Sequence, residues 1–275
     1  MSTEVTDLAA TQPVRERPVP PPQPLRPLRD ALTVTARNLI GYTRVPQLVV
    51  FSTVQPVIFV LLFRYVFGGA LKAPGVPYVD YLMPGIFVQT TVFGSLGTAV
   101  GLAADLKSGL LERFRSLPMA RSAVLAGRTT ADLARNVFVV ALMVAVGFAV
   151  GFRLHTNPLA LLAGLGLVLL FGYTMSWVFA TVGLAVGDPE TAQAAAFPVL
   201  APLVFASSVF VPVGSMPSWL QGFAAHQPVS VTASAVRALV LGGPTTSWVL
   251  QALAWCGGIL LVFAPLAVRK YRRTV

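Results

Sequence analysis

Residues 158–186 read PLALLAGLGLVLLFGYTMSWVFATVGLAV, a run without a single charged side chain. A helix that crosses a bilayer needs about 20 apolar residues, so this run predicts a membrane span. The rest of the chain has the same character, since 55% of its 275 residues are hydrophobic and only 11% are charged. Soluble domains carry about 25% charged residues. The sequence therefore predicts an all-α polytopic membrane protein.

Six spans are expected, and the distribution of basic residues orients them. The other five cover about residues 47–68, 81–104, 131–151, 192–211 and 247–268. Fifteen of the 20 Lys and Arg residues lie before the first span, between the second and third spans, or after the sixth, and a sixteenth, Arg135, lies just inside the third span on the same side. Basic residues gather on the cytoplasmic side of membrane proteins. Both termini are therefore expected in the cytoplasm, which requires an even number of spans.

The N-terminal region is expected to divide into a tail and a surface helix. Residues 1–27 lack the apolar core of a signal peptide and include the proline-rich stretch PVPPPQPLRP at 18–27, which predicts a disordered cytoplasmic tail. Residues 28–275 are expected to form one six-span transmembrane domain. At its start, Leu28, Leu32, Leu39 and Tyr42 share one helical face. This face predicts an N-terminal interfacial helix on the inner membrane surface.

Residues 214–244 contain two short apolar pieces, 217–225 and 229–241, separated and followed by proline and glycine. The longer piece would span about 20 Å as a helix, which is too short to cross a bilayer. A seventh span would also place the basic C-terminal tail outside. The segment is therefore expected to form outer re-entrant helices between spans five and six. Its candidate residues are Pro217, Trp219, Pro228 and Arg237.

The sequence offers no candidate catalytic, cofactor or metal site. It contains no Gly-Lys pair, which excludes a Walker motif, and no HExxH, CxxC or GxSxG motif. The single cysteine, Cys256, lies in an apolar run, and neither His155 nor His226 has an evident carboxylate partner. Asp132 and Arg135 are expected at the start of the third span rather than deep within it. Ion-driven transport is therefore not expected, and the energy must come from elsewhere.

The connection between the second and third spans has the pattern of an amphipathic helix. Residues 105–132 read DLKSGLLERFRSLPMARSAVLAGRTTAD. Leu106, Leu110, Phe114 and Leu117 follow helical spacing, and Pro118 would end the helix. Such a helix can enter a groove on a partner protein or lie on lipid headgroups. Its amphipathic pattern alone does not distinguish the two.

This connection resembles the inner connection of type-2 ABC exporter permeases, particularly the daunorubicin-resistance type. The similarity rests on a Gly-x-x-Glu-Arg-Phe-Arg-x-Leu-Pro core at residues 109–118. A second similarity is MPSWLQGFAAHQPVSVTASAVRALVLGG at 216–243, which resembles the family's outer re-entrant segment. Asp105-Leu106-Lys107 departs from the more highly charged run of many relatives. The resemblance covers roughly residues 28–275.

The resemblance implies a coupling helix and a set of partners. Two permease chains, identical or related, would pair with two copies of a separate ABC ATPase subunit, which binds the ATP and Mg²⁺. No cofactor would bind this chain. The residues that the resemblance assigns to ATPase coupling are Asp105, Gly109, Glu112, Arg113, Phe114, Arg115, Leu117 and Pro118.

The expected function is export of a hydrophobic or amphiphilic compound, such as a drug, an antibiotic or a lipid, across the bacterial inner membrane. Export of a polysaccharide or glycolipid is the alternative. An intramembrane enzyme built on Ser207 and His226 is a remote alternative, as is a channel or assembly protein. Path-facing and lipid-facing apolar residues look alike in the sequence, so no substrate-path residues are predicted.

Overall fold

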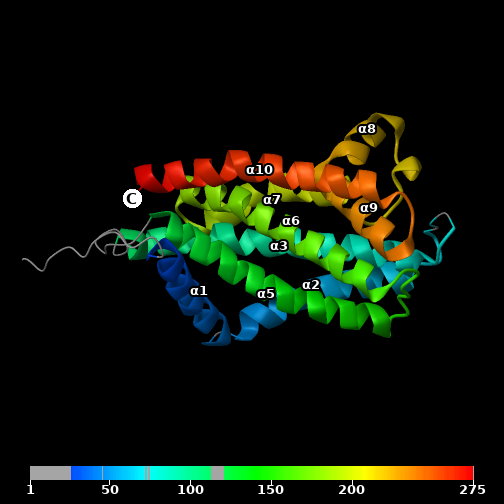
Figure 1. Ribbon diagram of the computed structural model, residues 1–275, viewed down its shortest axis with the longest axis horizontal. Coiled ribbons are helices and arrows are strands. Elements are labelled where there is room, and N and C mark those ends of the chain that lie inside the picture. The colour runs from blue at the N-terminus through cyan, green and yellow to red at the C-terminus, as the bar shows by residue number, and fades with distance from the viewer. Residues whose placement is uncertain (1–25, 45, 72, 74, 113–120, 275) are drawn as a thin grey trace, which may run out of the picture.

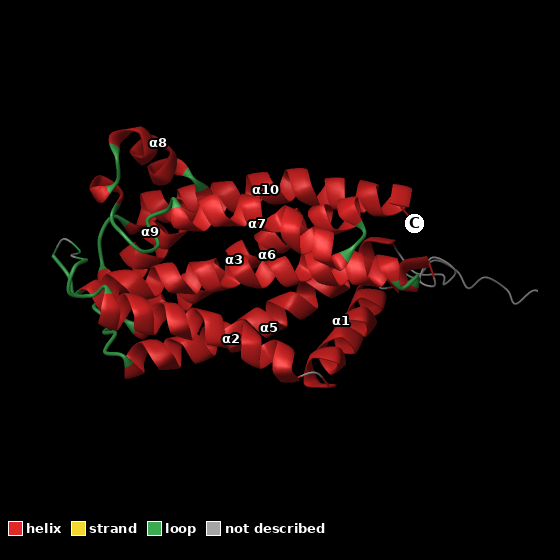
Figure 2. Ribbon diagram, turned by 180° about the vertical axis from the view of Figure 1, so that it is seen from behind, coloured by secondary structure: helices red, strands yellow, loops and turns green. Residues whose placement is uncertain are grey.

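In the computed structural model, residues 26–274 are described apart from 45, 72, 74 and 113–120. All regular structure in these residues is helical, which confirms the all-α prediction for them (Figure 2). The predicted tail at 1–27 lies almost wholly outside the described residues. The elements are α1 (Arg26–Arg44), α2 (Pro46–Leu61), the π-helical turn η1 (Leu62–Val66), α3 (Tyr78–Lys107), α5 (Arg121–Ala149), α6 (Pro158–Val186), α7 (Pro189–Phe205), the 3₁₀ turn η2 (Val213–Ser215), α8 (Ser218–His226), α9 (Pro228–Leu241) and α10 (Thr245–Thr274).

The long helices lie side by side along the length of the molecule, with α3 in the middle (Figure 1). At one end, α1 slants against α5 close to the C-terminus of α10; we call this the α1 end. The short helices α8 and α9 lie at the opposite end, which we call the α9 end (Figure 1). Contacts from α3 reach α2, α5, α6, α7 and α9. This central helix therefore touches both ends of the bundle.

Four described helices are long and apolar enough to cross a membrane: α3, α5, α6 and α10. The expected span at 158–186 coincides with α6. Its start is set by the Asn157 side chain, which accepts a hydrogen bond from the Ala160 amide at 2.7 Å, followed by Pro158 in the first turn. Its end is set by Gly187, whose φ of 75° suits glycine at a helix C-terminus.

The expected spans at 47–68 and 192–211 differ more from the structure. The first corresponds to α2 followed by η1, which ends at Val66. The second corresponds to α7, which has 17 residues and ends at Phe205, with Pro198 and Pro202 inside it. A helix of that length covers about 26 Å. Residues 206–212 then leave the helix and lead to η2 and α8.

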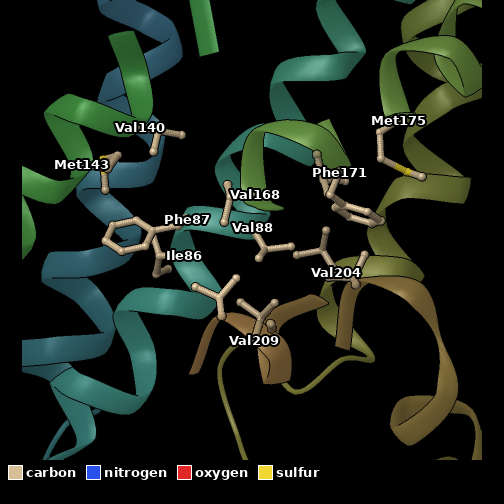
Figure 3. Packing of buried hydrophobic residues seen from close by; sticks show 14 of the residues in the cluster. Ile86, Phe87, Val88, Val140, Met143, Val168, Phe171, Met175, Val204 and Val209 are labelled. Atoms are coloured by element: carbon tan, nitrogen blue, oxygen red, sulfur yellow. The ribbon is translucent and has the colours of Figure 1, made fainter. Parts of the chain in front are cut away.

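The core forms where α3 meets its neighbours (Figure 3). Ile86, Phe87 and Val88 of α3 pack with side chains from α5, α6 and α7, and Phe87 meets Phe152 edge-on with ring centroids 6.2 Å apart. The backbones of α3 and α6 approach closely at Gly183, where any Cβ would overlap the Ala99 carbonyl. Small residues allow such approaches between membrane helices.

The helix that carries Asp132 and Arg135 starts earlier than the expected span at 131–151. The helix α5 begins at Arg121, ten residues before the expected span. Its first part packs closely on α1. A Cβ added at Gly127 would lie only 2.7 Å from the Ala31 carbonyl oxygen and from Val34 Cβ. The first part of α5 therefore packs against α1 as part of the helix. As a result, Asp132 lies about 17 Å along α5 and is fully buried.

Candidate functional site

At the α1 end, one carboxylate connects three helices. Asp105, in the last turn of α3, lies 3.8 Å from the Arg37 guanidinium of α1 and 3.6 Å from that of Arg128 on α5. The side chains of Asp105 and Arg128 are 19% and 14% exposed, whereas that of Arg37 is 45% exposed. Because water screens it less, the Asp105–Arg128 pair is stronger than the Asp105–Arg37 pair. Asp105 therefore links the end of α3 to both α1 and α5.

A second, buried carboxylate continues this cluster between α3 and α5. Asp132 accepts a hydrogen bond from the Thr98 hydroxyl at 2.6 Å and lies 3.7 Å from Arg128 Nε. Arg128 Nη2 donates to the Gly97 carbonyl at 3.3 Å. The guanidinium fits only because Gly101 has no side chain, since a Cβ there would overlap it. Glycine on α3 thus makes room for a buried arginine of α5.

Arg135 and Asn136 extend the same contact one turn further. Arg135 donates to the Gly94 carbonyl. A Cβ at Gly97 would lie 2.8 Å from Arg135 Nη1. The Asn136 side chain is 2% exposed. Polar side chains inside a membrane protein face protein rather than lipid, so this seam binds α3 and α5 together over several turns.

Most of the predicted coupling residues follow this cluster in the chain, after the end of α3. The helix α3 ends at Lys107, Ser108 and Gly109 form a turn, and helical structure resumes at Leu110. Gly109 has φ of 69°, a conformation that favours glycine. The expected single helix through 105–117 is therefore wrong, because this turn separates Leu106 from Leu110.

The described coupling residues have different environments. Glu112 is exposed, whereas its neighbour Leu111, which is not among the predicted coupling residues, is buried. Asp105 belongs to the buried cluster above the turn rather than to an exposed face. The remaining predicted residues lie outside the described residues: Arg113, Phe114, Arg115, Leu117 and Pro118.

An ion pair joins the end of α3 to the start of α7. Lys107 Nζ donates to Asp188 Oδ1 at 2.7 Å, and the other oxygen of Asp188 accepts from the Thr191 amide and hydroxyl, each at 3.0 Å. The bond from Lys107 and then those from Thr191 lower the pKa of Asp188 to about 2. Asp188 is therefore ionised at neutral pH and caps α7.

At the α9 end, a buried arginine holds three segments together. Arg237 of α9 is 8% exposed. Its Nε donates to the Tyr81 carbonyl at 2.9 Å, and its Cζ lies 3.8 Å from the Tyr81 ring centroid. Nη1 donates to the Ser208 hydroxyl at 3.1 Å, and Nη2 donates to the carbonyls of Ser208 at 2.6 Å and Val209 at 3.0 Å. Within the described residues, all four recorded acceptors are uncharged.

Further hydrogen bonds attach the α7–η2 connection to its neighbours. The hydroxyls of Tyr81 and Tyr78 on α3 donate to the carbonyls of Ser208 and Phe210, each at 2.9 Å. The Gln227 side chain, which caps α9 by accepting from the Val229 amide, also donates to the Leu203 carbonyl at 2.9 Å. The chain between α7 and α9 is therefore fixed to α3 by side-chain bonds.

The predicted re-entrant residues fall into distinct positions here. Pro217 precedes α8, Pro228 begins α9, and Trp219 on α8 is 79% exposed. Arg237 is the one among them with a buried polar network. Sequence reasoning selected Arg237 but missed its partners Tyr81 and Ser208, because they lie 156 and 29 residues away. No local pattern marks them.

The histidines and the proposed catalytic pair have structural partners. His155 Nε2 lies 3.7 Å from Asp80, so the absence of a carboxylate partner expected from sequence is wrong. Asp80 also accepts from the Arg153 amide at 2.8 Å. Ser207 donates to the Val204 carbonyl, whereas His226 contacts the Gly222 carbonyl. Within the described ranges, no three His, Cys, Asp or Glu side chains gather as a metal site would require.

Comparison with known proteins adds a family match. The model of a family described as ABC-2 type transporter matches residues 29–241. The "Daunorubicin resistance ABC transporter permease protein DrrB1" of Streptomyces coeruleorubidus is 34% identical over 241 residues, which cover 88% of this chain and 85% of the relative. The "Probable doxorubicin resistance ABC transporter permease protein DrrC" of Mycobacterium tuberculosis is 30% identical over 246 residues, covering 89% and 88%. The "Doxorubicin resistance ABC transporter permease protein DrrB" of the same species is 28% identical over 205 residues, covering 72% and 70%.

Proposed function

The chain belongs to the ABC-2 type transporter family, and we propose that it is the transmembrane permease subunit of an ATP-driven exporter in the bacterial inner membrane. The observation that carries the proposal is similarity over most of the chain to permeases named for resistance to daunorubicin and doxorubicin. Those names favour a hydrophobic or amphiphilic cargo, such as a drug, an antibiotic or a lipid, over a polysaccharide. ATP and Mg²⁺ would bind a separate ATPase subunit.

We propose six spans formed by α2 with η1, α3, α5, α6, α7 and α10, with residues 28–275 as one transmembrane domain after a cytoplasmic tail. The basic C-terminal tail and α1 lie at the same end of the bundle (Figure 1), which supports a cytoplasmic α1 end. The helix α9 has 14 residues and is about 21 Å long, too short to cross. Together with α8 it would re-enter the membrane from the outer side.

The proposed coupling step begins at the segment around Gly109 to Pro118, where the ATPase would dock. ATP binding and hydrolysis supply the movement of the ATPase subunits. Displacement of Glu112 and its neighbours would reach α3 through the turn at Gly109. From the end of α3, Asp105 would carry the displacement to α1 and α5, and Lys107 would carry it to α7 through Asp188. Two permease chains and two ATPase chains would form the complete exporter.

The test compares two substitutions in the proposed coupling segment with one control substitution outside it. Glu112→Ala and Phe114→Ala are expected to reduce co-purification with the ATPase while the permease stays at normal abundance in the membrane. If Glu112 forms a buried, hydrogen-bonded charge pair with the docked ATPase, its removal would cost ~2–5 kcal/mol of docking free energy. Glu190→Ala is the matched control, since this carboxylate is also exposed but lies on α7 outside the coupling segment. The free energy of ATPase docking to Glu190→Ala is expected to stay within about 0.5 kcal/mol of the parent value.

Membrane abundance, co-purification and transport are measured for all three variants. Full docking and full transport by both Glu112→Ala and Phe114→Ala would remove this segment from the mechanism. Equal losses in Glu190→Ala would show that charge at this end, rather than the coupling motif, governs docking.

A further inference from the structure

A cavity of about 520 Å³ opens at the α9 end, between α9, the α7–η2 connection and the start of α10. Sites that bind small molecules have volumes of about 300–1,000 Å³. The cavity has apolar walls that include Val213, Leu241 and the Trp248 side chain. Polar groups enter it from Arg237 and Ser234, which lie one turn apart on α9. The cavity thus has a wall for an apolar body and a separate polar corner.

The polar corner carries a positive charge that its lining does not neutralise. Arg237 is the one Lys or Arg among the described lining residues, and none of them is Asp or Glu. The acceptors recorded for Arg237 are three carbonyls and one hydroxyl. The nearby acid in sequence, Asp80, instead accepts a hydrogen bond from the Arg153 backbone amide and lies 3.7 Å from His155 Nε2, both on the α5–α6 connection. A buried charge held only by dipoles attracts an opposite charge strongly, because little water screens it.

Two hydrogen-bond donors remain available in this corner. A guanidinium has five N–H groups, and the four recorded bonds of Arg237 leave one N–H on Nη1. The Ser234 hydroxyl is partly exposed in the same cavity. An anionic oxygen can accept from both, and such charge-assisted bonds are stronger than neutral ones.

We propose that this cavity binds the anionic group, a phosphate or carboxylate, of an amphiphile whose apolar body lies against Trp248 and Leu241. The ligand is either a phospholipid headgroup of the surrounding leaflet or a free monoanionic amphiphile, since both present the same chemistry. The proposal goes beyond the proposed function, because binding at this cavity needs neither the ATPase nor transport.

The test places a fluorescent reporter in the cavity wall. Trp248 is kept as the sole tryptophan by Trp177→Phe, Trp219→Phe and Trp255→Phe, and the full chain is placed in phosphatidylcholine nanodiscs. In the lipid arm, phosphatidylglycerol with brominated acyl chains is compared with equally brominated phosphatidylcholine. In the free-ligand arm, 1-pyrenebutyrate is compared with uncharged 1-pyrenebutanol. Quenching of Trp248 is titrated in each arm.

Two aspartate substitutions test the role of charge without removing the bonds of Arg237 that hold α9. Ser234→Asp puts a carboxylate into the polar corner, whereas Ser218→Asp adds the same charge at the exposed start of α8, outside the cavity lining. Saturable quenching by at least one anionic probe is expected, stronger than by its uncharged or zwitterionic counterpart. Ser234→Asp is expected to weaken the affinity for the anionic probe by about tenfold or more, and Ser218→Asp is expected to weaken it by less than about twofold.

The arm that shows anion-selective quenching identifies the source, lipid or free amphiphile, and either supports the proposal. Equal quenching by anionic and control probes in both arms overturns it, and this comparison in the parent chain decides even if Ser234→Asp fails to fold. Unchanged affinity in a folded Ser234→Asp variant also overturns it. Because no ATPase is present, neither result bears on the proposed function.

Discussion

Asp132→Ala removes the carboxylate at the centre of the α3–α5 seam and should strongly destabilise the permease. The lost group is fully buried, accepts the 2.6 Å bond from Thr98 and lies 3.7 Å from Arg128. Removing one partner of a buried ion pair costs about 3–5 kcal/mol where the other charge is left unpaired, and because Arg128 keeps Asp105 at 3.6 Å we expect a cost near the lower end of that range. The Thr98 bond alone accounts for little of this, since hydrogen bonds between membrane helices average about 0.6 kcal/mol and reach about 1.7.

Three comparison variants separate these contributions. Thr98→Val removes only the hydroxyl and should cost about 0.6–1.7 kcal/mol. Asp132→Asn keeps an acceptor for Thr98 but loses the charge, so it should fall between Thr98→Val and Asp132→Ala. Glu112→Ala removes an exposed carboxylate and should change the free energy of unfolding of the isolated permease by less than about 0.5 kcal/mol.

The free energy of unfolding is measured for the purified permease in mixed micelles with increasing sodium dodecyl sulfate, followed by circular dichroism. The double variant of Thr98→Val with Asp132→Ala completes a thermodynamic cycle. We expect it to be no less stable than Asp132→Ala alone, because both changes break the same bond. A cost below about 1 kcal/mol for Asp132→Ala would refute the buried ion pair as a stabilising contact.

Three further results are expected. Gly183→Ala should cost about 1–3 kcal/mol by overpacking α6 on α3, whereas Gly166→Ala, with open space at its Cβ, should cost nothing or stabilise. In a Cys256→Ala background, Gly243→Cys should react with a membrane-impermeant thiol reagent from outside; labelling only after the inner face is opened would reject the six-span topology. The pKa of Asp188 is lowered from 3.8 to about 2, so its contribution to stability is present above pH 3.8 and lost as the pH falls toward 2. The stability difference between parent and Asp188→Asn should be constant above about pH 5 and shrink below pH 4.

The long apolar helices were predictable from sequence because their ends carry local signals. The bounds of α6 follow from Asn157, Pro158 and Gly187, each of which acts within one turn of the helix end. The early start of α5 was not predictable in this way. Its first ten residues look like a water-exposed connection in sequence, whereas in the structure Gly127 packs on α1 and Val124 and Leu125 belong to a buried cluster with Leu102 of α3 and Trp177 of α6.

The candidate sites were predictable as segments but not as networks. The motif around Gly109 marks the proposed coupling segment, yet the turn at Gly109 depends on a positive φ that amphipathic spacing does not reveal. Arg237 stood out as an arginine within an apolar piece. Its partners Tyr81 and Ser208 reach it only through the folding of α3 and α7 around α9, and such distant contacts leave no pattern in a single sequence.

The most direct test of the account is ATP-driven export by the reconstituted pair. This chain and its partner ABC ATPase subunit would be placed together in inside-out membrane vesicles, and accumulation of daunorubicin and other aromatic amphiphiles would be measured. We expect accumulation that requires ATP, requires both polypeptides and persists when the proton gradient is abolished. Accumulation that follows the proton gradient, or that this chain alone supports with ATP, would contradict its role as the permease subunit of an ABC exporter.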